Sequence, residues 1–139
     1  KDEQAAKIFG KPNGHARAQS FAYQPIVRMS NTYILPGDAD DEEMFEGSGV
    51  FLKGMSGGSV DPFTGGFMFK SAIGWRFRNG KFMEVLKDAV VSGNFLSTLK
   101  NVELIGKEVR LYPGFCGKSG QSVPVSDGGP KIRVRVFLG

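Results

Sequence analysis

The chain has 139 residues, 40% of them hydrophobic and 23% charged, which favours a single folded domain over residues 1–139 and excludes a linker or a short peptide. Its net charge of +4 comes from scattered basic residues with no run of five or more, so the charge does not indicate direct nucleic-acid binding. One cysteine excludes an internal disulfide, and no apolar stretch approaches the roughly 20 residues of a membrane span, so we expect a cytoplasmic protein without membrane contact.

The composition also indicates the fold class. The chain contains 20 glycines, 7 prolines and 12 phenylalanines, a combination typical of sheets joined by tight turns. We therefore expect a mainly β fold, with a large, curved, mostly antiparallel sheet and two or three short helices.

The first third of the chain predicts one helix and then mostly extended structure. Residues 2–9 favour a short helix, because acidic residues at its start suit the helix dipole and Gly10 and Pro12 end it. Residues 14–38 predict edge strand and loop with prolines as breaks. The acidic residues 38–47 predict a short helix or a solvated turn.

The middle of the chain carries the clearest strand signal. Residues 49–54 predict a strand, and residues 55–66 predict a glycine-rich turn region. An alternating apolar face follows, formed by Phe67, Phe69, Ile73, Trp75 and Phe77. An Asn-Gly pair at residues 79–80 predicts a type I′ hairpin turn, which places Phe77 opposite Phe82.

Two further elements are predicted in the last third. Residues 90–111 include a helix with Asn94 as its cap, and Gly106 ends the segment. The helix-spaced apolar stripe consists of Phe95, Leu96, Leu99, Val102 and Leu104. Residues 132–138 alternate apolar side chains with arginines, which predicts a terminal strand with one buried face.

The stretch PGFCGKSGQSVPV at residues 113–125 contains the one cysteine, Cys116, and a Gly-Lys-Ser that suggests a phosphate-binding loop. A Walker A loop needs glycine where this chain has Tyr112. It also needs a helix afterwards, which Pro124 and Pro130 do not allow. We therefore exclude a phosphate loop here.

Several interpretations of Cys116 stay open. A nucleophilic thiolate needs a base, and the one histidine, His15, lies far away in the sequence. A zinc site needs three or four ligands, so Cys116 can only contribute one to a site completed elsewhere in a longer protein. From composition alone, a packed free thiol in a glycine-rich turn is the simpler interpretation. The acidic residues 38–46 are interpreted as a solvated face without catalysis.

Four stretches, in this order and spacing, resemble the C-terminal domain of the TldD/PmbA family, whose members are also described as modulators of DNA gyrase. They are GHARAQSFAYQPIVRMSNTYILPGD, GGSVDPFTGGFMF, NGKFMEVLKDAVVSGN and CGKSGQSVPVSDGGPKIRV. The resemblance runs from about Gly14 to Gly139, nearly the whole chain. Four motifs in order are far more specific than any one of them.

The resemblance implies a β-rich C-terminal domain of a much longer α+β protein. The TldD-like branch is a zinc metallopeptidase that hydrolyses peptides or unfolded polypeptides. Its zinc is held by two histidines of an HExxxH helix and by the cysteine of the last motif, here Cys116. Such a ligand set leaves a fourth position for water. The resemblance also implies a homo- or heterodimer with a TldD/PmbA-type subunit.

This chain departs from the family pattern in one large respect. It contains no HExxxH segment, and His15 does not match a ligand position. We therefore expect a fragment, or one half of a split enzyme, that holds no catalytic residue and is inactive alone. The candidates for substrate contact or for support of the metal ligand are Gly117, Gln121, Arg28 and Asn31.

Two alternatives accompany these assignments. The candidate residues can instead make structural hydrogen bonds in turns. The rival function is a non-catalytic interaction domain that modulates a partner such as DNA gyrase, with Cys116 as a packed thiol.

Overall fold

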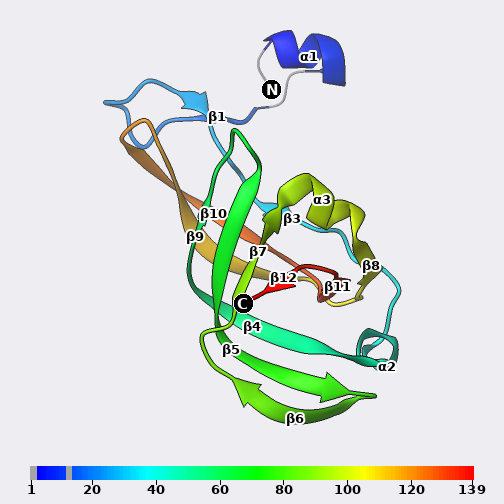
Figure 1. Cartoon of the computed structure of the whole chain (residues 1–139). Helices are drawn as coiled ribbons and strands as arrows, with labels where there is room; N and C mark the ends of the chain where they lie inside the picture. Colours follow the sequence, from blue (N-terminus) through cyan, green and yellow to red (C-terminus); the bar gives the residue numbers. More distant parts are fainter. Residues whose placement is uncertain (1–2, 12–13) are drawn as a thin grey trace. The chain divides into compact units, whose positions relative to one another are not determined.

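The computed structural model describes residues 3–11 and 14–139, which form strands and three short helices (Figure 1). The helices are α1 Glu3–Phe9, α2 Asp41–Met44 and α3 Phe95–Lys100. The strands are β1 Ala16–Arg17, β2 Ile26–Val27, β3 Thr32–Tyr33, β4 Ser48–Val60, β5 Gly66–Arg78, β6 Lys81–Leu86, β7 Val90–Asn94, β8 Val102–Ile105, β9 Arg110–Lys118, β10 Gln121–Gly129, β11 Ile132–Val134 and β12 Phe137–Leu138. The expected mainly β, mostly antiparallel fold is confirmed.

The chain divides into two compact units, each built from two separate segments. Unit 1 comprises Lys1–Leu35 and Val109–Gly129, and unit 2 comprises Pro36–Glu108 and Pro130–Gly139. The strands that the structure describes belong to four sheets, of which the largest has five strands. The assignment of one domain to residues 1–139 stays a prediction.

Unit 1 contains α1, the β1–β2 pair and a three-stranded sheet in the order β3-β10-β9. The predicted N-terminal helix is confirmed over Glu3–Phe9, and Gly10 follows with a φ of 87°, a conformation that glycine adopts at helix ends. Asp2 and Pro12, which the sequence places at the two ends of this helix, lie outside the described residues. No helix in the described ranges has the length and apolar character needed to cross a membrane.

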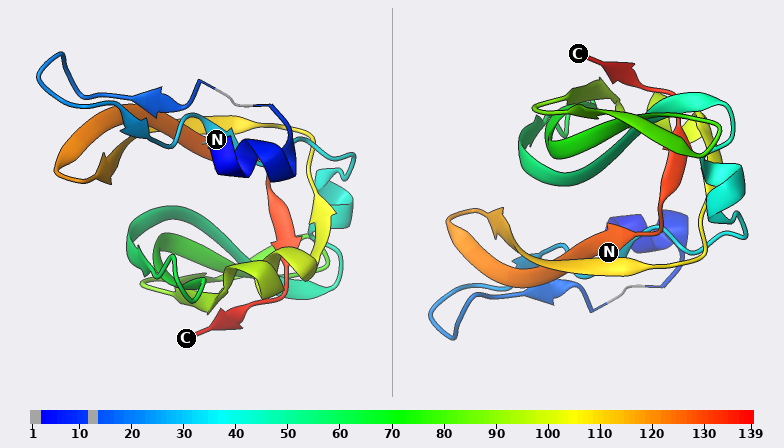
Figure 2. Two further views of the ribbon diagram at one scale, coloured as in Figure 1. Left: turned by 90° about the horizontal axis from the view of Figure 1, so that it is seen from above. Right: turned by 90° about the horizontal axis from the view of Figure 1, so that it is seen from below.

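Unit 2 contains the five-stranded sheet, in which β5 pairs with three other strands. It pairs with β4 along its whole length, with β7 near its start and with β6 near its end. Figures 1 and 2 show that β4 and β5 bend strongly along their length. The β4–β5 register shifts between Met55 and Gly57, and such bulges increase the local bend of a strand.

The predicted hairpin turn is confirmed, whereas the predicted turn region before it is too long. Asn79 and Gly80 have φ values of 46° and 75°, and Phe77 pairs with Phe82 as expected for a type I′ turn. Residues 55–60, expected in the turn, belong to β4. Glycine is needed there for packing, because a Cβ on Gly58 would lie 2.3 Å from the ring of Phe69.

The core of unit 2 is a cluster of aromatic rings. The ring of Phe45 lies edge-on to Phe77 and Phe82, at centroid distances of 5.2 and 5.1 Å. Phe51 and Trp75 stack beside them at 5.8 Å. Phe77 is only 6% exposed, so it is the most buried ring of the cluster, and burial of a large aromatic side chain stabilises the fold.

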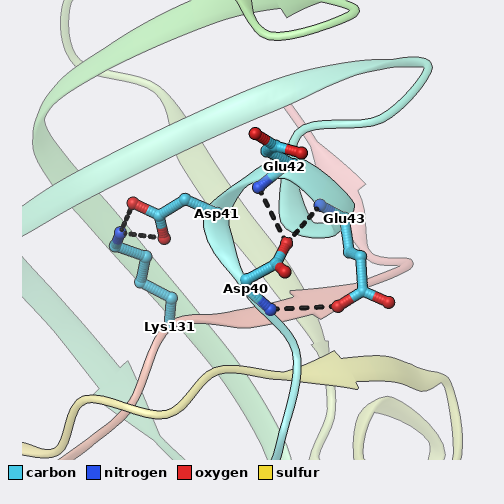
Figure 3. A network of polar contacts seen from close by, with 5 residues as sticks. All are labelled: Asp40, Asp41, Glu42, Glu43 and Lys131. Atoms are coloured by element: carbon cyan, nitrogen blue, oxygen red, sulfur yellow. Dashed lines mark hydrogen bonds and ion pairs between the residues drawn. The ribbon is translucent and has the colours of Figure 1, made fainter.

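Helix α2 positions Phe45 for this cluster. Figure 3 shows its capping box, in which the Asp40 carboxylate accepts from the Glu43 N–H and the Glu43 carboxylate accepts from the Asp40 N–H. Lys131 Nζ lies 2.5 Å from Asp41 Oδ1, which ties the first turn of the helix to the C-terminal segment of unit 2. Of the two outcomes expected for residues 38–47, the helix is the one observed.

The last third differs from its prediction in two places. Asn94 caps α3 as expected, but the helix ends at Lys100, because Val102–Ile105 form β8 and pair with β11. The predicted terminal strand over residues 132–138 is two strands, since β11 pairs with β8 and β12 pairs with β7. Apolar spacing alone does not separate these outcomes, because partner strands distant in sequence decide them.

We predict that Phe77→Ala lowers the free energy of unfolding by about 3–5 kcal/mol, because it removes a buried ring and leaves a cavity. Urea denaturation measures this change. The matched control is Phe63→Ala, since Phe63 is 99% exposed and its loss should change the free energy by less than about 0.5 kcal/mol. Equal effects of the two substitutions would contradict the assignment of the core.

Candidate functional site

Cys116 lies in β9, within a regular antiparallel hairpin formed by β9 and β10. The two strands pair without interruption from Lys118 opposite Gln121 to Arg110 opposite Gly129. The expectation that Cys116 lies in a glycine-rich turn is therefore wrong. The turn is made by Ser119 and Gly120, with φ values of 51° and 71°, and Cys116 pairs with Val123 two residues before the paired end of the hairpin.

One face of this hairpin is covered by the segment of residues 15–29, which Figure 2 shows alongside it. The segment is tied to the hairpin by side-chain bonds to backbone carbonyls. Arg17 Nη1 donates to Pro124 O at 3.1 Å, and Lys118 Nζ donates to Val27 O at 2.9 Å. Arg17 Nη2 also donates to Met29 O, so one guanidinium joins both ends of the segment to the hairpin.

The side chains of Gln19 and Gln121 each accept a hydrogen bond from a backbone N–H of the opposite part of the chain. The Gln19 N–H donates to Gln121 Oε1 at 3.1 Å, and the Ser122 N–H donates to Gln19 Oε1 at 2.7 Å. Gln121 Nε2 in turn donates to Gln24 O. Gln121 is only 7% exposed, so these bonds satisfy an amide that would be costly to bury alone.

Arg28 is the most deeply buried charged side chain at this site, with 3% of its surface exposed. Its Nη2 donates to the carbonyl of Cys116 and, at 3.1 Å, to the carbonyl of Gln121, so one nitrogen bridges the two strands of the hairpin. Its Nε and Nη1 are buried and have no hydrogen-bond partner among the described residues. Buried donors are nearly always satisfied, so these two nitrogens are available to donate to a further acceptor, either water or an anion.

The surroundings of Cys116 favour its thiolate form. A backbone hydrogen bond from Met29 is the main cause that lowers the pKa of Cys116. Partial burial opposes this effect, while the Arg28 side chain, through a hydrogen bond and its charge, and the charge of Arg17 lower the pKa further. Thiolates are the form that binds metals, and Cys116 as a residue is half-buried and not fully enclosed.

The other candidate residues differ in how close they lie to Cys116. Arg28 and Gln121 adjoin it, as described above. Gly117 is exposed, pairs with Ser122 and has open space around its Cα. The side-chain Oδ1 of Asn31 accepts from the Ser126 N–H at 3.0 Å, which places Asn31 farther along β10, away from Cys116. A role of these residues in substrate contact stays a prediction.

Sequence reasoning missed Arg17 and Gln19. Both lie on the segment that covers the hairpin, Arg17 in β1 and Gln19 in a bend. Their bonds to the hairpin reach residues more than 100 positions away in the sequence, so no local sequence signal indicates them. His15 contributes its carbonyl, which accepts from the Arg28 N–H at 2.9 Å, while its side chain is exposed.

At this site, Cys116 is the candidate metal ligand among the described residues. Among them, no group of three or more His, Cys, Asp and Glu side chains is arranged to hold a metal ion. The donor chemistry of Cys116 nevertheless fits zinc, because an accessible thiolate is a preferred zinc ligand.

Comparisons with known proteins point to one family. A family model described as the PmbA/TldA metallopeptidase C-terminal domain matches residues 1–138. The chain is similar to a metalloprotease of Methanothermobacter thermautotrophicus, with 51% identity over 135 residues that cover 96% of this chain and 30% of the relative. It is also similar to a zinc metalloprotease TldD homolog of Saccharolobus solfataricus, with 44% identity over 89% of this chain and 28% of the relative.

A solved structure supports the fold. It is that of a proposed modulator of a DNA gyrase from Thermotoga maritima, which matches 99% of this chain and 29% of its own with a TM-score of 0.70 at 22% identity. The chain thus spans about 30% of the length of the relatives that it matches.

We predict that the thiol of Cys116 is alkylated at a lower pH than the same thiol in the urea-denatured chain. The folded pKa is lowered, so the reactive thiolate persists as the pH falls toward that pKa. Rates of reaction with iodoacetamide across pH measure this. Arg28→Gln should move the midpoint upward, because it removes a neighbouring charge, whereas coincident folded and denatured curves would contradict the proposed environment.

Proposed function

Because the chain belongs to the family of PmbA/TldA metallopeptidase C-terminal domains, we propose that it is the part of a TldD-like zinc metallopeptidase that contributes Cys116 as one zinc ligand. The observation that carries this proposal is the environment of Cys116. The residue is half-buried, and hydrogen bonds from the Met29 backbone and the Arg28 side chain lower the pKa of its thiol. A thiol used only for packing needs no such stabilisation of its charged form.

The other zinc ligands belong, in this proposal, to a segment outside this chain. An HExxxH helix there supplies two histidines and a glutamate base, as the resemblance implies. When bound, zinc supplies a Lewis acid for the hydrolysis of a peptide bond. The Arg28 bridge to the carbonyls of Cys116 and Gln121 supports the ligand, because it fixes the backbone from which the sulfur projects.

The strand that carries Cys116 also suits a peptide substrate. In the part of the chain that the structure describes, β9 pairs with β10 alone, so its other edge is open. Pro113 lies on this strand, and proline is typical of edge strands. The free N–H and C=O groups of such an edge bind extended chains of any sequence, which suits a peptidase for unfolded polypeptides.

A second candidate function is a non-catalytic interaction domain. Large apolar side chains that are nearly fully exposed favour it, because such side chains often mark protein contacts. Phe21 and Phe63 are 103% and 99% exposed, and Phe115 is 77% exposed. The similar Thermotoga maritima protein is described as a modulator of a DNA gyrase, which names one class of partner. An HExxxH sequence encoded upstream of Lys1 favours the peptidase, and its absence favours the interaction domain.

The peptidase proposal predicts that this chain, purified alone, binds zinc weakly and cleaves no peptide. One thiolate is too few ligands for tight binding, since protein zinc sites use three or four. Metal analysis after dialysis measures the zinc content. Tight zinc in a one-to-one ratio would mean that the chain holds a complete site, contrary to the proposal.

In the complete protein, we predict that Cys116→Ala removes zinc and peptidase activity while the fold remains. The side chain makes no disulfide, so its loss should destabilise the protein only modestly. Zinc content, activity and circular dichroism are measured together, with Ser122→Ala as a control on the exposed face of the paired strand. If zinc and activity survive the loss of the thiol, then Cys116 is structural.

A further inference from the structure

The charge of the chain is concentrated in unit 1. Unit 1 contains seven basic and three acidic residues and so carries the whole net charge of +4, while unit 2, with eleven of each, is neutral. A net charge confined to the unit that holds Cys116 attracts anions to that unit.

Three cations of unit 1 converge on the end of the hairpin that carries Cys116. Arg17, Arg28 and Lys118 each donate to backbone carbonyls of the hairpin or of the segment that covers it. Within the described residues, none of the three forms an ion pair with a carboxylate. No carboxylate among the described residues therefore compensates their charges at close range.

These cations also have N–H groups that donate to no acceptor among the described residues. Arg28 Nε and Nη1 and Arg17 Nε are buried without a partner among the described residues. Lys118 is exposed and uses one of its N–H groups on Val27 O, which leaves two for another acceptor. Of the acidic residues that the structure describes in unit 1, Asp127 pairs with Tyr112 toward the other end of the hairpin, and Glu3 lies in α1.

We propose that Arg17, Arg28 and Lys118 form a subsite for a carboxylate of the bound peptide, so that the enzyme prefers acidic peptides. This inference rests on the proposed peptidase function. Lys118 contacts the carboxylate through its free donors, and Arg17 and Arg28, whose unused donors are buried, add charge that solvent screens poorly. The carboxylate is either an acidic side chain near the scissile bond or the free C-terminus of a short substrate.

The test uses the complete zinc-loaded protein and three peptides that differ at one residue beside the scissile bond. That residue is Glu, Gln or Lys, and each peptide is made with a free and with an amidated C-terminus. We expect kcat/KM to fall from Glu to Gln to Lys by about two- to fivefold per step, the range of partly exposed charge pairs. A preference for free over amidated ends, in place of the Glu preference, identifies the C-terminus as the group recognised.

Variants assign the preference to the proposed residues. Lys118→Gln should bring the Glu-to-Gln ratio toward one, and Lys118→Arg should restore it. Lys81→Gln is the matched control, because it removes the same charge from an exposed strand of unit 2 and should keep the wild-type ratio. Circular dichroism and zinc content establish that each variant is folded and loaded.

Two results would contradict the proposed carboxylate subsite. One is equal kcat/KM for all three peptides with either end, and the other is a Glu preference that Lys118→Gln leaves unchanged. Failure to cleave any peptide, including the neutral Gln peptide, would instead contradict the proposed peptidase function. The two proposals thus fail through different measurements.

Discussion

The bridge from Arg28 to the carbonyls of Cys116 and Gln121 is the interaction on which the candidate site depends. A buried guanidinium is costly unless its charge is compensated and its donors are satisfied. Here one nitrogen joins both strands of the hairpin, Nε and Nη1 have no partner among the described residues, and the guanidinium lowers the pKa of the Cys116 thiol. The cation thus fixes the backbone at Cys116 and also stabilises the charge that a metal ligand must carry.

The two units are stabilised by different kinds of interaction. Unit 2 is held by aromatic packing around Phe77 and by the capped helix α2, both ordinary sources of stability. The covering segment of unit 1 is held largely by side-chain bonds to backbone carbonyls, which the arginines and glutamines provide. Polar attachment of this kind keeps charge and donors close to the thiol, where an apolar covering would remove both.

Local signals were predictable from the sequence, and pairings between distant strands were not. The Asn79-Gly80 turn and the Asn94 cap depend on a few adjacent residues, and both are confirmed. Residues 55–60 and Cys116 are expected in turns because glycines surround them, yet both lie in strands. In β4, Gly58 allows the ring of Phe69 to approach closely, whereas Gly117, next to Cys116, has open space where a side chain would lie. The family resemblance identifies Cys116 as a candidate zinc ligand, whereas no sequence motif indicates the contacts of Arg17 with the hairpin.

The central claim is that Cys116 is a zinc ligand in the complete protein, and zinc K-edge X-ray absorption tests it most directly. The account predicts one sulfur at about 2.3 Å, with nitrogen or oxygen ligands at about 2.0–2.1 Å, and loss of the sulfur signal in Cys116→Ser. A first shell of nitrogen and oxygen alone in the zinc-loaded wild-type protein would contradict it.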